Sequence, residues 1–67
     1  MNTYTFHFYH VARALEHVVS IRAAQEDHAR RAAHAEVADL LKKGRLMAGD
    51  WRLGITVMEP TQAEERA

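Results

Sequence analysis

Glu16-His17-Val18-Val19-Ser20-Ile21-Arg22-Ala23 is the stretch on which the fold of this chain depends. Its β-branched residues favour an extended backbone, because branching at Cβ restricts the side chain in a helix. The alternative is that a following helix extends backwards, since residues 12–16 are good helix formers. Residues 10–15 also contain no Gly, Pro, Asn or Asp to make a hairpin turn. In one long helix, however, Arg22 and Glu26 would interrupt the apolar stripe, so we favour a strand over residues 16–23.

Clear strand patterns stand on both sides of this stretch. Residues 3–9 read TYTFHFY and alternate aromatic with polar side chains, which predicts a strand over about residues 3–11. Residues 51–58 read WRLGITVM and predict a third strand, with Gly49-Asp50 as the turn before it and Pro60 as its end. Simple alternation would place Trp51, Leu53, Ile55 and Val57 on one face of that strand.

A helix is predicted between the second and third strands, over about residues 26–43. Acidic Glu26 and Asp27 open it and Lys42 and Lys43 close it, which suits the helix dipole, and Gly44 is placed to cap it. Its start has no good capping residue. One stripe of the helix is apolar and comprises Ala29, Ala33, Val37, Leu40 and Leu41.

The order strand-strand-helix-strand predicts a small α+β domain of the ββαβ type over residues 1–60, followed by a flexible tail at 61–67. A right-handed crossover from the second strand to the third puts the first strand in the centre. We therefore expect a three-stranded antiparallel or mixed sheet in the order 2-1-3, with one helix packed on one face. The expected core brings sheet residues against the helix: Phe6, Phe8, Val19, Ile21, Trp51, Leu53 and Ile55 would meet Ala33, Val37 and Leu40.

The amino-acid composition excludes several classes of function. The 67 residues contain no cysteine, which excludes disulfide scaffolds, thiolate zinc sites and thiol nucleophiles. Nine basic and nine acidic residues give a net charge of zero, whereas proteins that coat phosphates usually carry a basic excess. No apolar run approaches the length that spans a bilayer, and the amino terminus does not look like a signal peptide. We expect a soluble, cytoplasmic protein.

Neither a metal site nor a catalytic site is indicated by the polar residues. The five histidines have no chelating spacing: His28 and His34 are six positions apart and lie on different sides of a helix. Solvent-exposed histidine is the expected environment. No serine or threonine lies in a glycine-rich nucleophile turn, and the three glycines are too scattered to make a phosphate loop. The sequence predicts a protein that is not an enzyme, with no catalytic, cofactor-binding or metal-binding residues and no cofactor.

The sheet face opposite the helix is the candidate binding surface, because a single helix covers only one face. Tyr, Met and Arg, which are enriched where proteins meet, are among its expected residues. The edge strands would also be open to pairing with another chain. A homodimer that buries this face to complete its core is the alternative use. The expected partner-binding residues are His7, Tyr9, Val18, Arg22, Thr56 and Met58.

Residues 19–33, VSIRAAQEDHARRAA, resemble a pattern of small phage and mobile-element proteins. A strand there ends in alanine, a short polar link follows, and acidic residues precede an Ala-rich helix. DpnD/PcfM-like proteins and several small anti-CRISPR proteins share this ββαβ pattern. The resemblance covers about half of the chain and departs at Gln25, where those proteins usually have Ser or Asp. It implies a phage or mobile-element setting and assigns no functional residue.

Together these observations predict a non-enzymatic protein-binding module. The resemblance implies a phage-type stoichiometric inhibitor of a host protein complex, such as a CRISPR effector, that would occupy its target's surface as anti-CRISPR proteins do. The alternative is a small nucleic-acid-binding or regulatory protein, since aromatic side chains on a sheet can stack on bases. No membrane partner is expected.

Overall fold

The computed structural model describes residues 1–60 of the chain. Its elements follow the predicted ββαβ order: β1 (Asn2–His10), β2 (Glu16–Ala23), α1 (Glu26–Lys42) and β3 (Trp51–Pro60). The strand over residues 16–23 is therefore confirmed, and the long-helix alternative is wrong. β1 and α1 each end one position before the predicted bound, and β3 continues through Pro60. The tail predicted for 61–67 lies outside the described residues.

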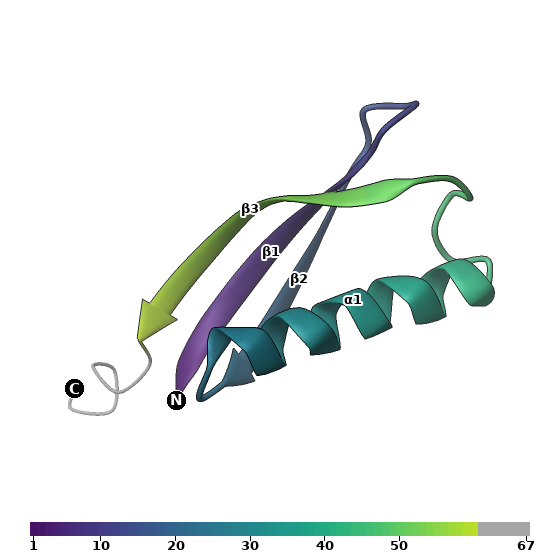
Figure 1. Ribbon diagram of the computed structural model, residues 1–67. Helices are drawn as coiled ribbons and strands as arrows, with labels where there is room; N and C mark the ends of the chain where they lie inside the picture. Colours follow the sequence, from purple (N-terminus) through teal and green to yellow (C-terminus); the bar gives the residue numbers. More distant parts are fainter. Residues whose placement is uncertain (61–67) are drawn as a thin grey trace.

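The three strands form one antiparallel sheet in the order β2-β1-β3, as predicted. α1 lies on one face of this sheet (Figure 1). The helix packs against β2 and the central strand β1 rather than over β3. β3 is an edge strand of the sheet and, unlike the other edge strand β2, has little cover from the helix, which explains why several of its large apolar side chains are exposed.

The hairpin between β1 and β2 closes without any of the usual turn residues. The backbone N–H of His10 donates to the Leu15 carbonyl (2.8 Å), and the Ala14 N–H donates to the His10 carbonyl (2.9 Å). Ala14 takes a left-handed backbone conformation with φ 56°, which is unfavourable for alanine. Burial of the flanking strands outweighs the local cost of this turn.

His10 joins the hairpin to the loop before β3. It is buried, so the expectation of solvent-exposed histidines is wrong at this position. Its Nε2–H donates to the Ala48 carbonyl (2.9 Å), and its Nδ1 accepts from the Arg13 N–H (3.1 Å). Gly49, at φ 139°, passes so close that a Cβ there would lie 2.4 Å from His10 Nε2. Such a buried and fully bonded imidazole is a structural group.

The core lies between α1 and the near face of the sheet. Phe6 and Phe8 are its largest fully buried side chains. Val37 is also buried, whereas Leu40 and Leu41 are half-buried at the end of the helix stripe. One expected core residue is misplaced, because Ile55 is 54% exposed. Among residues 1–60, the buried apolar residues are Tyr4, Phe6, Phe8, Val19, Ala29, Ala33 and Val37.

The two ends of α1 differ in how well they are capped. At the C-terminus the Gly44 N–H donates to the Leu41 carbonyl (3.1 Å) and the Arg45 N–H to the Leu40 carbonyl (2.8 Å), with Gly44 at φ 73°. This is a Schellman cap, so the predicted role of Gly44 is confirmed. Gln25 occupies the N-cap with extended geometry but makes no side-chain capping bond. Within residues 1–60, no helix is long and apolar enough to cross a membrane.

A β-bulge in β3 changes which of its side chains face the helix. Leu53 lies opposite Phe8 and Ile55 lies opposite His7, so Gly54 is the extra residue at the register shift. The bulge turns the residues after Gly54 to the opposite faces from those that simple alternation predicts. This is the reason Ile55 is exposed rather than part of the core.

Candidate protein-binding surface

The sheet face opposite α1, called the open face below, is built from rows of side chains that cross all three strands. Directly opposed residues of neighbouring strands share a face, so the strand register determines the rows. From one end of the face to the other, the rows are Glu16-Tyr9-Arg52, Val18-His7-Ile55, Ser20-Thr5-Val57 and Arg22-Thr3-Glu59.

Most of the predicted partner-binding residues lie together on this face. His7 is opposite Val18 and Ile55, Tyr9 is one row away, and Arg22 stands in the row of Thr3 at the far end. These positions follow from the alternation of β1, whose other side chains are buried under α1. The sequence therefore places His7, Tyr9, Val18 and Arg22 on the open face correctly.

Thr56 and Met58 are on the wrong face in the prediction. Thr56 lies opposite Phe6 and Met58 lies opposite Tyr4, so both belong to the α1 side of the sheet. The Gly54 bulge is the cause, because one extra residue reverses the facing of everything after it.

Ile55 and Val57 are the open-face residues that the sequence reasoning missed, since alternation placed them with Trp51 and Leu53. Gly54 carries the signal that could have located them. A lone glycine inside an otherwise alternating strand often marks a bulge. Allowing for a bulge there would have moved both side chains to the open face.

The two middle rows of the open face combine exposed apolar side chains with the polar side chains of His7, Thr5 and Ser20. Val18 is 46% exposed, Ile55 54% and Val57 43%, and these residues occupy the two middle rows. Beside them, the hydroxyls of Thr5 and Ser20 are hydrogen-bonded to each other at 3.2 Å. Charged residues occur only in the outer rows. An apolar centre with a charged rim is the usual composition of a protein–protein interface.

Tyr9 packs its ring over the backbone of β3 at the bulge. A Cβ on Gly54 would lie 2.3 Å from Cε2 of this ring, so only glycine leaves the space that the ring occupies. Tyr9 is half-buried in consequence. The aromatic side chain is thereby held against the sheet, and a rigid aromatic group loses little entropy when a partner contacts it.

His7 and Glu16 form the close acid–base pair of this face. The Nδ1–H of His7 donates to Glu16 Oε2 at 2.6 Å. A hydrolytic triad would also need a nucleophile bonded to the imidazole. Ser20 lies on the same face, but its hydroxyl is hydrogen-bonded to Thr5. The His7–Glu16 pair thus orders the surface without being connected to a nucleophile among the described residues.

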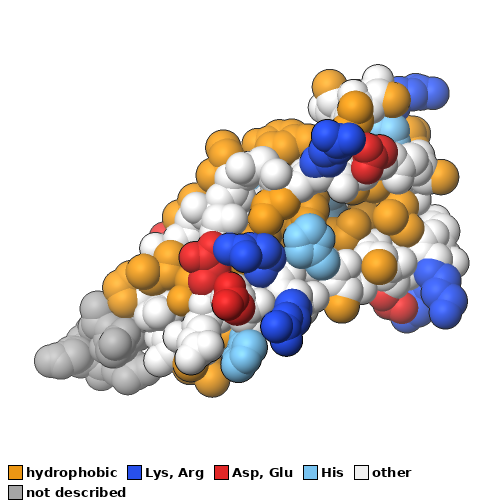
Figure 2. Space-filling view, viewed as in Figure 1, with side chains coloured by type: hydrophobic (Ala, Val, Ile, Leu, Met, Phe, Trp, Pro, Cys, Tyr) orange, Lys and Arg blue, Asp and Glu red, His pale blue; other side chains and the backbone are white. Residues whose placement is uncertain are grey.

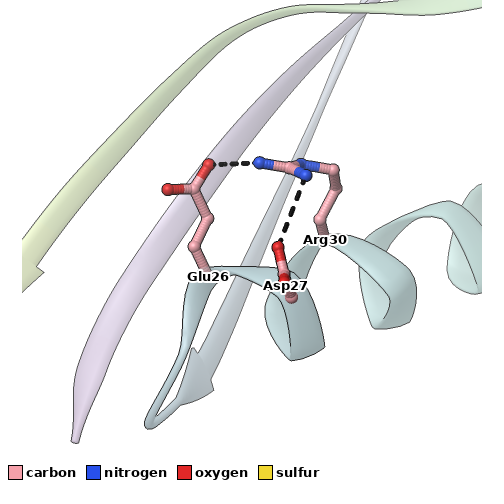
Figure 3. A network of polar contacts seen from close by, with 3 residues as sticks. All are labelled: Glu26, Asp27 and Arg30. Carbon is pink, nitrogen blue, oxygen red and sulfur yellow. Dashed lines mark hydrogen bonds and ion pairs between the residues drawn. The ribbon is translucent and has the colours of Figure 1, made fainter.

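A second candidate is a surface hollow of about 370 Å³ along α1, lined by Asp27, Arg30, Arg31 and His34. Arg30 is already engaged there, since its Nη2–H donates to Glu26 Oε2 and its Nη1 lies 3.7 Å from Asp27 Oδ1 (Figure 3). In Figure 2 these acidic and basic groups lie together on the helix, with hydrophobic side chains above them. Because the carboxylates of Glu26 and Asp27 neutralise the Arg30 guanidinium, the hollow offers little attraction to an anion.

Metal ligation finds no support in the part of the chain that the structure describes. No group of three or more His, Asp or Glu side chains is arranged there to hold an ion. The open face is therefore the surface with the strongest case for binding.

Comparisons with protein-family models, with curated proteins and with solved structures found no match to this chain.

Proposed function

We propose that this chain is a non-enzymatic protein-binding module that works through the open face of its sheet. In the specific form expected from the sequence, it is a stoichiometric inhibitor that occupies the surface of a host protein complex. The observation that carries the proposal is the set of exposed apolar side chains in the middle rows, Val18, Ile55 and Val57, between outer rows that carry charges.

Charge supports a protein partner over a nucleic acid. Arg22 and Arg52 on the open face are balanced by Glu16 and Glu59, so the face has no basic excess. Nucleic-acid-binding surfaces depend on such an excess to displace counterions from phosphates. Of the β1 aromatic residues that could stack on bases, Tyr4, Phe6 and Phe8 are buried, and Tyr9 alone lies on the open face.

The first test compares two substitutions on the same strand. Ile55→Ser removes an exposed side chain from the open face, whereas Met58→Ser removes one of similar exposure, 54% against 51%, from the α1 side. Each tagged variant is used to capture partners from a bacterial host lysate treated with nuclease. We expect the wild type and Met58→Ser to retain the same protein and Ile55→Ser to lose it, because removing a central apolar contact weakens an interface.

The second test asks whether the effect is stoichiometric. The captured complex is purified and its activity is titrated with the chain. Inhibition that reaches a plateau at a fixed molar ratio is expected of a surface-occupying inhibitor. Progressive inactivation by a small molar fraction of the chain would indicate an enzyme instead. Capture of nucleic acid alone, lost at raised salt, would contradict the proposal.

A further inference from the structure

The charges at the corners of the open face alternate in sign. β2 carries Glu16 at one end and Arg22 at the other, and β3 carries Arg52 beside the first end and Glu59 beside the second. Like charges therefore stand on opposite corners, and unlike charges stand next to each other. All of these residues are exposed.

This arrangement is complementary to itself. Two copies that meet face to face are related by a two-fold axis lying between the sheets. If the axis runs along the strands, each row lies opposite the same row of the other copy, with the β2 and β3 residues exchanged. Glu16 then meets Arg52 of the other copy. If the axis runs across the strands, the two outer rows exchange, and Glu16 meets Arg22 instead. Either axis pairs every corner charge with its opposite.

Between the corners, the middle rows carry no Asp, Glu, Lys or Arg. They contain Val18, Ile55 and Val57, the mutually bonded Thr5 and Ser20, and His7, whose imidazole is bonded to Glu16. Aligned sheets pack through rows of this kind, with strand directions within about 30° of each other. With the axis along the strands, Val18 would face Ile55 of the other copy; with the axis across the strands, Ile55 would face Val57.

Two of the corner charges have partners within the chain. Arg52 Nε lies 3.1 Å from Asp50 Oδ2, and Glu16 is bonded to His7. The Arg52 pair is well exposed, with 72% and 60% of the side-chain surfaces accessible, so it is held weakly. Arg22 and Glu59 have no hydrogen-bond or ion-pair partner among the described residues. The corner groups are thus available to a second copy.

We propose that the open face binds a second copy of this chain and forms a symmetric dimer by face-to-face sheet packing. The inference goes beyond the proposed function, because it names a second occupant for the same surface: the open face would bind another protein only after the dimer has dissociated. Strands spaced about 4.8 Å apart, with about 3.3 Å per residue, make a three-stranded face of this length a small one. Interfaces of that size are at the lower end of specific association, so we expect a weak and reversible dimer.

Charge reversal in mixtures tests the symmetry directly. The wild type is expected to change from monomer to dimer between low micromolar and millimolar concentration in sedimentation equilibrium. Glu16→Arg, Arg22→Glu and Arg52→Glu alone should each weaken association about tenfold or more, because each substitution occurs twice in a symmetric dimer. Arg31→Glu, which reverses a charge on α1, is the matched control and should dimerise like the wild type.

Mixing the variants should restore association. With the axis along the strands, Glu16→Arg and Arg52→Glu form a mixed dimer in which all corner pairs are again opposite in sign. With the axis across the strands, Glu16→Arg is rescued by Arg22→Glu instead. Rescue by one of these partners supports the proposal and identifies the axis. Rescue by neither, or a wild type that stays monomeric throughout, overturns it.

The same variants separate this proposal from the proposed function. If the wild type is monomeric but Ile55→Ser still loses its captured protein, the dimer is wrong and the protein-binding function stands. If the dimer forms and Ile55→Ser abolishes it without altering capture, the open face is a dimer interface and the proposed use of it for another protein is wrong.

Discussion

Ala14 is the residue at which local chemistry and the fold disagree most. It is the one non-glycine residue among 1–60 with positive φ, at 56°, and it lies in the hairpin turn between β1 and β2. Left-handed backbone costs an L-residue about 1–2 kcal/mol, and glycine is free of this cost. Ala14 therefore stores local strain that the rest of the hairpin offsets.

Replacing this alanine should release the strain. We expect Ala14→Gly to raise the free energy of unfolding by about 0.5–1 kcal/mol, since the relief exceeds the extra entropy of glycine in the unfolded chain. Urea denaturation followed by circular dichroism measures the change. Ala12→Gly is the matched control in the same turn, and it should leave stability unchanged or lower it. Equal effects of both substitutions would show that Ala14 is not strained.

Gly54 is the reason that the candidate surface could be predicted only in part. His7, Tyr9, Val18 and Arg22 were placed correctly because β1 and β2 alternate without interruption. Thr56 and Met58 are predicted on the wrong face. Successive residues of a strand point to alternate faces, and one bulged residue reverses this alternation for every residue after it. Propensity alone does not distinguish a glycine in a regular strand from a glycine at a bulge.

Among the strands and the helix, the sequence predicted best those elements in which the residue pattern and the secondary-structure propensity agreed. The β-branched run of residues 16–23 identified β2, and the charge order together with Gly44 located α1 to within one residue at its end. The turn at residues 11–14 was not predictable from its own residues. It exists because Phe6 and Val19 are opposed and buried on the two strands that it joins, and this long-range burial overrides turn chemistry.

α1 begins at a residue that contributes nothing to its cap. Gln25 has the extended geometry of an N-cap residue, but its side chain makes no capping hydrogen bond. We expect Gln25→Ser to stabilise the protein by about 1 kcal/mol, because a serine hydroxyl accepts a bond from an unpaired N–H of the first turn. The midpoint of thermal unfolding should rise by several degrees. Ala24→Ser, one residue earlier, should have no such effect, and a rise of similar size there would argue against capping as the cause.

Across the whole molecule, the two faces of the sheet differ in burial, and the proposed function assigns binding to the more exposed one. The α1 side holds every buried apolar residue of the described chain, and the open face holds half-buried and exposed side chains. A core made of so few large groups implies a modest free energy of unfolding, roughly 3–9 kcal/mol at about 0.05–0.15 kcal/mol per residue. Loss of a single large core side chain should therefore be enough to unfold the domain.

Phe6 and Tyr9 test this division on a single strand. Phe6 is fully buried against α1, whereas Tyr9 lies over Gly54 on the open face. Phe6→Ala should cost about 3–5 kcal/mol and leave most of the protein unfolded at 37 °C, because the cavity cannot be refilled in so small a core. Tyr9→Ala should lose only about 1 kcal/mol, the contact of the ring with the β3 backbone, and keep a cooperative thermal transition.

Circular dichroism against temperature measures both variants, and Phe6→Leu provides the conservative control that keeps most of the buried volume. Tyr9→Ala should still impair capture of a protein partner, because it removes an aromatic group held in place on the open face. A Phe6→Ala protein that unfolds like the wild type, beside a Tyr9→Ala protein without a transition, would mean that the faces are assigned the wrong way round. The expected result instead separates the contacts that make the domain fold from those that it offers to a partner.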